Sequence, residues 1–172
     1  MRRAAFTLVE LMVVLLILAL TAGAVTLRLH AQGRAANLAD VVDSLKSFDH
    51  QSRQLAQRRG QGCLVTWNLA SGAIGRSDLD GKGDWGDGWQ VPPGYSLAEL
   101  IVGSQRTDRG RMALPCTGGG QMPSYAVHVV GPKDEGTWLL VAGLTGAGVE
   151  VDSAKSAQDI LALTLQGRPD AD

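Results

Sequence analysis

The chain has 172 residues, of which 45% are apolar and 19% charged, and its formal net charge is −1. This length allows one domain of ordinary size plus a separate helix. The charge is unevenly placed: residues 1–59 hold 8 Lys or Arg against 4 Asp or Glu (+4), whereas residues 60–172 hold 8 against 13 (−5). The acidic second part is a poor electrostatic match for nucleic acid, which argues against nucleic-acid binding.

The N-terminus combines a short basic leader, Met1-Arg2-Arg3, with an apolar segment that runs from Phe6 to Leu27. About 22 residues are enough for a helix to cross ~30 Å of hydrocarbon. Glu10 is the one charged residue inside the segment. A carboxylate there costs roughly 2.5–3.5 kcal/mol, so Glu10 needs a partner or a purpose. The leader predicts a cytoplasmic N-terminus and an exported C-terminal part.

The sequence Ala5-Phe6-Thr7-Leu8-Val9-Glu10 resembles the class III signal of type IV pilins and type II secretion pseudopilins. The resemblance implies that a prepilin peptidase removes residues 1–5 by cleaving between Ala5 and Phe6. Phe6 then carries the N-terminal methylation, and the Glu10 carboxylate pairs with the terminal ammonium of a neighbouring subunit during filament assembly. The family usually has Gly where this chain has Ala5, which is also small. A buried ammonium–carboxylate pair is, independently, one of few ways to make Glu10 tolerable in lipid.

An ordinary secretory signal is the alternative interpretation of the same residues. It would use Arg2 and Arg3 as the basic region, Leu11–Leu20 as the apolar region and Ala22-Gly23-Ala24 as the cleavage site. This interpretation leaves Glu10 unexplained, and its cleavage site interrupts a pattern that continues as one helix.

Residues 28–59 carry an amphipathic helical pattern that extends the apolar segment. No Pro interrupts residues 6–59, and Arg58-Arg59-Gly60 is typical of a helix end. The sequence therefore predicts one helix from Phe6 to Arg59, about 80 Å long, whose first half (6–27) spans the membrane. The apolar stripe consists of Leu38, Val41, Val42, Leu45, Phe48 and Leu55. The other face carries Asp40, Asp43, Lys46, Asp49, Gln51 and Arg53.

From Gly60 onward, short apolar runs alternate with glycine-rich turns. This texture predicts an α+β fold in which the amphipathic half of the helix packs on an antiparallel β-sheet domain, residues 60–151. In the C-terminal extension, residues 152–172, Ser156 and Asp159 predict the cap of a short helix through Leu165. The predicted strands, with Ser96–Val102 left ambiguous, are Cys63–Leu69, Trp89–Val91, Ser124–Val130, Thr137–Ala142 and Gly148–Val151.

Residues 84–91, which contain Trp85, Gly88 and Trp89, resemble the W-x-x-G-W turn of the GspH/FimT family. That family comprises minor pseudopilins of type II secretion and minor pilins of type IV pili. The resemblance implies a pilin-like fold and a non-enzymatic H-type pseudopilin, anchored in the bacterial inner membrane by a single pass with its domain in the periplasm. Its implied partners are other pseudopilins, the prepilin peptidase, the inner-membrane secretion platform and secreted exoproteins.

Two further functions are weighed against the pseudopilin. A minor pilin of a type IV pilus, including one that binds DNA for uptake, belongs to the same superfamily. DNA-binding members carry arginines in a C-terminal Gly-Arg-x-Arg turn, whereas this chain reads Gly146-Ala147-Gly148 without arginine. A secreted enzyme would need a catalytic constellation, and neither Gly-x-Ser-x-Gly nor a Cys–His pairing is suggested by the sequence.

Cys63 and Cys116 lie in the part of the chain predicted to be exported. An oxidising compartment favours a disulfide between them, and the alternative is a pair of small buried hydrophobes. No cofactor or metal site is predicted, because the cysteine and histidine spacings suit no zinc motif. Lys82 and Trp89 occupy EF-hand ligand positions, which excludes an EF-hand; a looser calcium site in the acidic loop 78–87 remains open.

Overall fold

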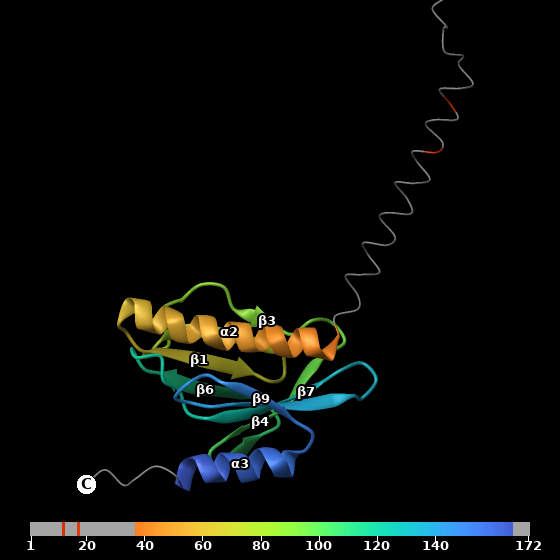
Figure 1. Cartoon of the computed structure of the whole chain (residues 1–172). Helices are drawn as coiled ribbons and strands as arrows, with labels where there is room; N and C mark the ends of the chain where they lie inside the picture. The colour runs from red at the N-terminus through yellow and green to blue at the C-terminus, as the bar shows by residue number, and fades with distance from the viewer. Residues whose placement is uncertain (1–11, 13–16, 18–36, 167–172) are drawn as a thin grey trace, which may run out of the picture. The chain divides into compact units, whose positions relative to one another are not determined.

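The computed structural model describes Met12, Ile17 and residues 37–166 (Figure 1). The chain divides between Ala36 and Asn37 into two units, and the second is described here. The predicted leader (1–5) lies outside the described residues, as does the predicted membrane-spanning segment (6–27) apart from Met12 and Ile17. In the part of the chain that the structure describes, no helix is long and apolar enough to cross a membrane.

Helix α2 spans Leu38–Arg59 and has a start of its own. Asn37 is in an extended conformation (φ −70°, ψ 153°), and its N–H donates to the Asp40 carboxylate at 3.1 Å. The prediction of one uninterrupted helix from Phe6 to Arg59 is therefore wrong at Asn37, which is not helical and caps the start of α2. The predicted end is confirmed: Gly60 follows Arg59 in the left-handed region at φ 62°.

In the described residues, nine strands form antiparallel sheets on which α2 packs, which confirms the predicted fold class. The strands form two sheets instead of the predicted single one. The first sheet has the order β3-β2-β1-β6 and the second β5-β4-β7-β8-β9. The strands are β1 (Cys63–Asn68), β2 (Ala73–Asp78), β3 (Trp89–Gln90), β4 (Ser96–Val102), β5 (Gln105–Thr107), β6 (Arg111–Cys116), β7 (Tyr125–Val130), β8 (Gly136–Val141) and β9 (Gly148–Val151).

The five predicted strands correspond to β1, β3, β7, β8 and β9, and the ambiguous segment Ser96–Val102 is strand β4. Strands β2, β5 and β6 were not predicted. In β2, Ile74 is the one fully buried side chain, so the strand lacks an apolar alternation. Strand β6 contains Pro115, a residue that argues against a central strand but is tolerated at the edge position that β6 occupies.

The main core lies between α2 and the sheets. Trp67 on β1 and Tyr125 on β7 meet edge to face, with ring centroids 5.2 Å apart, and thereby join the two sheets. The buried stripe of α2 does not continue to Leu55, which is only partly buried, but through Ser52 and Ala56. The buried residues of α2 are Val41, Val42, Leu45, Phe48, Asp49, Ser52, Arg53 and Ala56.

Helix α3 spans Ala154–Gln166 and covers the face of the five-stranded sheet opposite α2 (Figure 1). Its cap is Ser153, whose Oγ accepts from the Ser156 N–H at 3.1 Å, so the prediction of Ser156 as the capping residue is wrong. Helix α3 begins earlier than predicted because β9 ends at Val151, and only two residues connect that strand to the helix. The second core under α3 consists of Ala157 and Leu161 packed on Ile101, Ala126, Trp138 and Leu140.

We expect Leu161→Ala to lower the free energy of unfolding by about 2–5 kcal/mol, because it opens a cavity between α3 and the sheet. The Leu161 side chain is 1% exposed, whereas that of Leu163 in the same helix is 67% exposed. Leu163→Ala is thus the matched control and should change stability by less than about 0.5 kcal/mol. Urea unfolding of both variants measures the difference, and equal effects would show that α3 does not close the sheet.

Candidate functional site

The residues predicted to direct cleavage, methylation and assembly, Ala5, Phe6 and Glu10, lie outside the described residues. The chain passes from them into the folded domain through Asn37 and α2. Any function that works through the N-terminus therefore depends on how firmly α2 is held by the two sheets.

Asp49 and Arg53 form a buried ion pair one turn apart on α2. The Arg53 Nε donates to Asp49 Oδ2 at 2.6 Å, and the two side chains are 4% and 5% exposed. The Tyr125 hydroxyl donates to Asp49 Oδ1 at 2.9 Å. The sequence prediction that placed Asp49 and Arg53 on the solvent-facing side of the helix is wrong. Charge alone suggested an exposed face, but paired charges can be buried.

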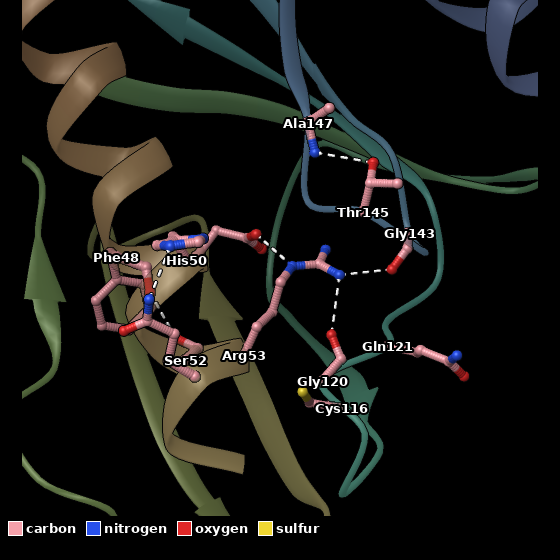
Figure 2. Close-up of polar contacts among 12 residues, drawn as sticks. Phe48, His50, Ser52, Arg53, Cys116, Gly120, Gln121, Gly143, Thr145 and Ala147 are labelled. Atoms are coloured by element: carbon pink, nitrogen blue, oxygen red, sulfur yellow. Dashed lines mark hydrogen bonds and ion pairs between the residues drawn. The ribbon is translucent and has the colours of Figure 1, made fainter. Parts of the chain in front are cut away.

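Arg53 also joins two loops that belong to different strand connections (Figure 2). Its Nη1 donates to the Gly120 carbonyl at 3.2 Å, between β6 and β7, and to the Gly143 carbonyl at 2.5 Å, between β8 and β9. The Met122 N–H donates to the same Gly143 carbonyl at 3.0 Å. Gly146 has a φ of 73°, and a Cβ there would lie 3.0 Å from the Arg53 side chain. The loop is therefore shaped around the arginine.

The electrostatics of this network follow from its burial. Burial raises the pKa of Tyr125 well above its ordinary value, with Asp49 adding to the shift. The hydroxyl therefore keeps its proton and remains a donor to the carboxylate. A buried ion pair is costly to desolvate, so it is held only where hydrogen bonds satisfy its atoms. Tyr125 and the two glycine carbonyls meet this condition for Asp49 and for Nη1 of Arg53, whereas Nη2 of Arg53 is buried without a hydrogen-bond partner.

The Trp-Gly-Trp turn fastens the loop between β2 and β3 to α2 at two points. Trp85 is buried, its Nε1 donates to Asp78 Oδ1 at 2.5 Å, and the Arg59 guanidinium lies 4.5 Å from its ring centroid. The Trp89 Nε1 donates to Ser44 Oγ at 2.8 Å. A Cβ at Gly88 would lie 2.7 Å from the Ile74 carbonyl oxygen, so a larger residue would push the turn off β2.

Arg76 of β2 holds the same side of α2. Its Nε donates to Ser52 Oγ at 2.8 Å, its Nη2 donates to the Phe48 carbonyl at 3.3 Å, and its guanidinium lies 4.0 Å from the Phe48 ring centroid. Burial lowers the pKa of Arg76 from its ordinary value, but arginine remains charged at any physiological pH. Ser52 thus serves as an acceptor on the helix, which explains why a polar residue interrupts the apolar stripe.

Beside this contact lies a shallow surface hollow of about 200 Å³, lined by Gln51, Gln54, Leu55, Arg58 and Arg76. Its lining is a partly buried leucine among polar groups, without the acid, base and nucleophile that catalysis would combine.

The acidic loop holds no candidate metal site in the structure. Asp78 accepts from Trp85, and Asp84 accepts from the Gly86 N–H at 3.1 Å. Within residues 37–166 and the two described residues before them, no group of three or more His, Cys, Asp or Glu side chains could hold a metal ion.

Cys63 and Cys116 are brought together by strand register. Cys63 opens β1, Cys116 closes β6, and the antiparallel ladder pairs them directly. Both are buried and both thiols are free in this structure, so the disulfide stays a prediction. The sequence could not show this pairing, because the partner strand β6 was not predicted.

The first 26 residues match a family model described as the prokaryotic N-terminal methylation motif. No curated protein matches the chain. Among solved structures, the chain is similar to the minor pseudopilin EpsH from the Type 2 Secretion System of Vibrio cholerae, with 15% sequence identity and a TM-score of 0.47. The similarity covers 64% of this chain and 92% of that one.

We expect Arg53→Met to lower the free energy of unfolding by about 3–5 kcal/mol, because Asp49 and two carbonyls lose their cationic partner in a buried place. Arg58→Met, at an exposed position of the same helix, is the control and should be nearly neutral. The double variant Asp49→Leu with Arg53→Met should lose less stability than Arg53→Met alone, since no unpaired charge stays buried. Denaturant unfolding decides, and a neutral Arg53→Met would show that the pair does not hold α2.

Proposed function

We propose that this chain is a minor pseudopilin, a non-enzymatic subunit that assembles into the periplasmic pseudopilus of a type II secretion system. The observation that carries the proposal is the N-terminal methylation motif in residues 1–26, joined through α2 to a domain of antiparallel sheets. The prepilin peptidase and the other pseudopilins are the partners that this motif implies. The inner-membrane platform and secreted exoproteins are the further proposed partners.

The proposed mechanism is assembly rather than catalysis. The N-terminal segment (6–27) anchors the subunit in the inner membrane and then packs in the filament core. Force on that segment would reach the domain through α2. The buried contacts of Arg53 with Gly120 and Gly143 transfer it to both sheets, because each loop continues into a different strand pair. Arg76 and Trp85 fasten α2 to β2 and to the following loop.

A second contact ties the first half of α2 to the far edge of the five-stranded sheet. Lys46 donates to Asp43 at 3.0 Å and to Glu150 of β9 at 2.8 Å. The hydrogen bond to Glu150 raises the pKa of Lys46, so the ammonium stays charged throughout the physiological range. Because the groups are partly exposed, this contact contributes orientation more than stability.

Deletion of the gene distinguishes type II secretion from a type IV pilus. A pseudopilin deletion should leave exoproteins in the periplasm while surface pili and DNA uptake are unchanged. Loss of pili or of DNA uptake with normal secretion would instead establish the minor pilin. Complementation with the wild-type chain is the control for both measurements.

We expect the mature protein to begin at Phe6 and to carry a methyl group on its amino terminus. Cleavage between Ala5 and Phe6 follows from the methylation motif. Mass spectrometry of the membrane-purified protein measures the start, and cells that lack the prepilin peptidase provide the unprocessed control. A mature chain that begins at Val25 would contradict the proposal and establish the secretory signal.

We expect Glu10→Leu to raise the amount of protein in the membrane fraction and to impair its co-purification with the other pseudopilins. Removing the carboxylate lowers the insertion cost, but it also removes the partner of a neighbour's N-terminal ammonium. Glu10→Asp should be intermediate, since the charge remains and the reach is shorter. Val9→Leu, in the same segment without a change of charge, is the control. Wild-type co-purification of Glu10→Leu would show that charge pairing is not its role.

A further inference from the structure

The C-terminal end of α2 contacts the turn that directly follows one of two buried, paired cysteines: Gln57 Nε2 donates to the Gly119 carbonyl at 3.0 Å. In an antiparallel ladder, directly opposed residues point to the same face with Cα atoms about 4.5–5.5 Å apart. Disulfides need about 4.4–6.8 Å. Cys63 and Cys116 are opposed in this way and are 0% and 1% exposed.

We propose that Cys63 and Cys116 form a disulfide bond before the C-terminal end of α2 packs over this region. The bond then fixes the turn of residues 117–121, whose carbonyls accept hydrogen bonds from α2. The proposal rests on the proposed function in one respect, because export supplies the oxidising compartment. The pairing itself rests on the register of β1 and β6.

The oxidant would be a disulfide, carried by a thiol oxidoreductase or by a small molecule. The Cys63 thiolate attacks one sulfur of that disulfide and expels the other as a thiolate. The Cys116 thiolate then attacks the Cys63 sulfur and expels the second thiol. Two protons leave the cysteines and the oxidant gains two electrons. The hydrogen bond from Cys116 lowers the pKa of Cys63, with Arg76 and Arg59 adding to the shift, which favours Cys63 as the attacking group.

The order of events follows from how closely the backbone covers the pair. A Cβ at Gly62 would lie 2.9 Å from the Cys116 carbonyl oxygen, and a Cβ at Gly118 would lie 2.9 Å from the Gly60 carbonyl. Gly62 is therefore packed against the last residue of β6, and Gly118 is packed against the C-terminal end of α2. The two thiols are 0% and 1% exposed, so the folded chain offers an oxidant no open path to them. The bond therefore forms fastest after β1 and β6 have paired and before α2 takes its final place, and a later reaction requires local opening.

The disulfide bond would fix the position of the turn whose carbonyls accept hydrogen bonds from α2. Strand β6 is an edge strand that pairs only with β1 among the described strands. Cys116 is its last residue and leads directly into the turn of residues 117–121, part of which Figure 2 shows. In this turn the Gly119 carbonyl accepts from Gln57 Nε2 at 3.0 Å, and the Gly120 carbonyl accepts from Arg53. A link between Cys63 and Cys116 therefore holds the acceptors of α2 in place.

The test compares two times of oxidation in the full chain, purified in a mild detergent. In one arm, the reduced and denatured chain refolds in the presence of oxidised glutathione. In the other, the reduced chain folds first and oxidised glutathione follows. Thiols are counted by alkylation under denaturing, non-reducing conditions. We expect the bond to form during refolding and to form at least about tenfold more slowly in the folded chain, because oxidation then requires local opening.

Hydrogen exchange supplies a second readout. Amides of residues 117–121 and of the last turn of α2 should exchange faster in the reduced chain than in the oxidised one, whereas those of α3 should not change. Free thiols after refolding would overturn the disulfide site. Equal oxidation rates in the two arms would overturn the order of events, and equal exchange would overturn the role in holding α2.

A matched control moves one thiol to the neighbouring position. In the variant Cys63→Ala with Leu64→Cys, the new cysteine opposes Pro115 and points to the other face of the sheet. It should not bond to Cys116, and efficient bonding would overturn the geometric argument. Chain purified from cells with both thiols free, while refolding closes the bond, would contradict export and hence the proposed function, but would support the pairing.

Discussion

The ion pair of Asp49 and Arg53 is the point at which α2 and both sheets are joined. The Arg53 guanidinium contacts a carboxylate of its own helix and the carbonyls of two loops. Tyr125, on a central strand, donates a hydrogen bond to the second oxygen of that carboxylate. Hydrophobic contacts can hold a helix on a sheet, but they tolerate sliding, since apolar packing has no direction. The hydrogen bonds at Arg53 have direction, and they therefore set one register of α2 along the sheets.

The other contacts of α2 depend on that register. Ser44 meets Trp89 and Ser52 meets Arg76 only if the helix lies at one axial and rotational position. Both contacts reach α2 from the side of β2 and β3, whereas Lys46 meets Glu150 of β9 in the five-stranded sheet, so α2 is held from both sheets. The glycine of the Trp-Gly-Trp turn allows the flanking loop to approach β2 closely enough to reach the helix. The arrangement explains why this loop and the short strand β3 that follows it each contain a tryptophan, Trp85 and Trp89.

Part of this structure could be predicted because it depends on neighbouring residues. Gly60 ends α2 as predicted, since a left-handed residue after a basic turn is a local feature. The apolar runs Tyr125–Val130 and Gly148–Val151, each bounded by turn residues, likewise mark their strands. The buried position of Arg53 could not be predicted in this way, because its acceptors are main-chain carbonyls 67 and 90 residues away. A spacing of four between Asp49 and Arg53 was the one available indication, and it equally fits an exposed pair. The N-cap at Asn37 interrupted a pattern that hydrophobic periodicity alone continued.

Helix α3 has a consequence for the time between synthesis and assembly. In the proposed function, each subunit exists for a time as a separate folded chain before a growing filament takes it up. During that time an uncovered sheet face with Ile101, Trp138 and Leu140 would adhere to other exposed apolar surfaces. Because α3 follows β9 after two residues, the chain covers this face as soon as its last strand is in place. The subunit thereby carries its own protection against premature association, and any neighbour that approaches from this side meets a helix instead of a sheet.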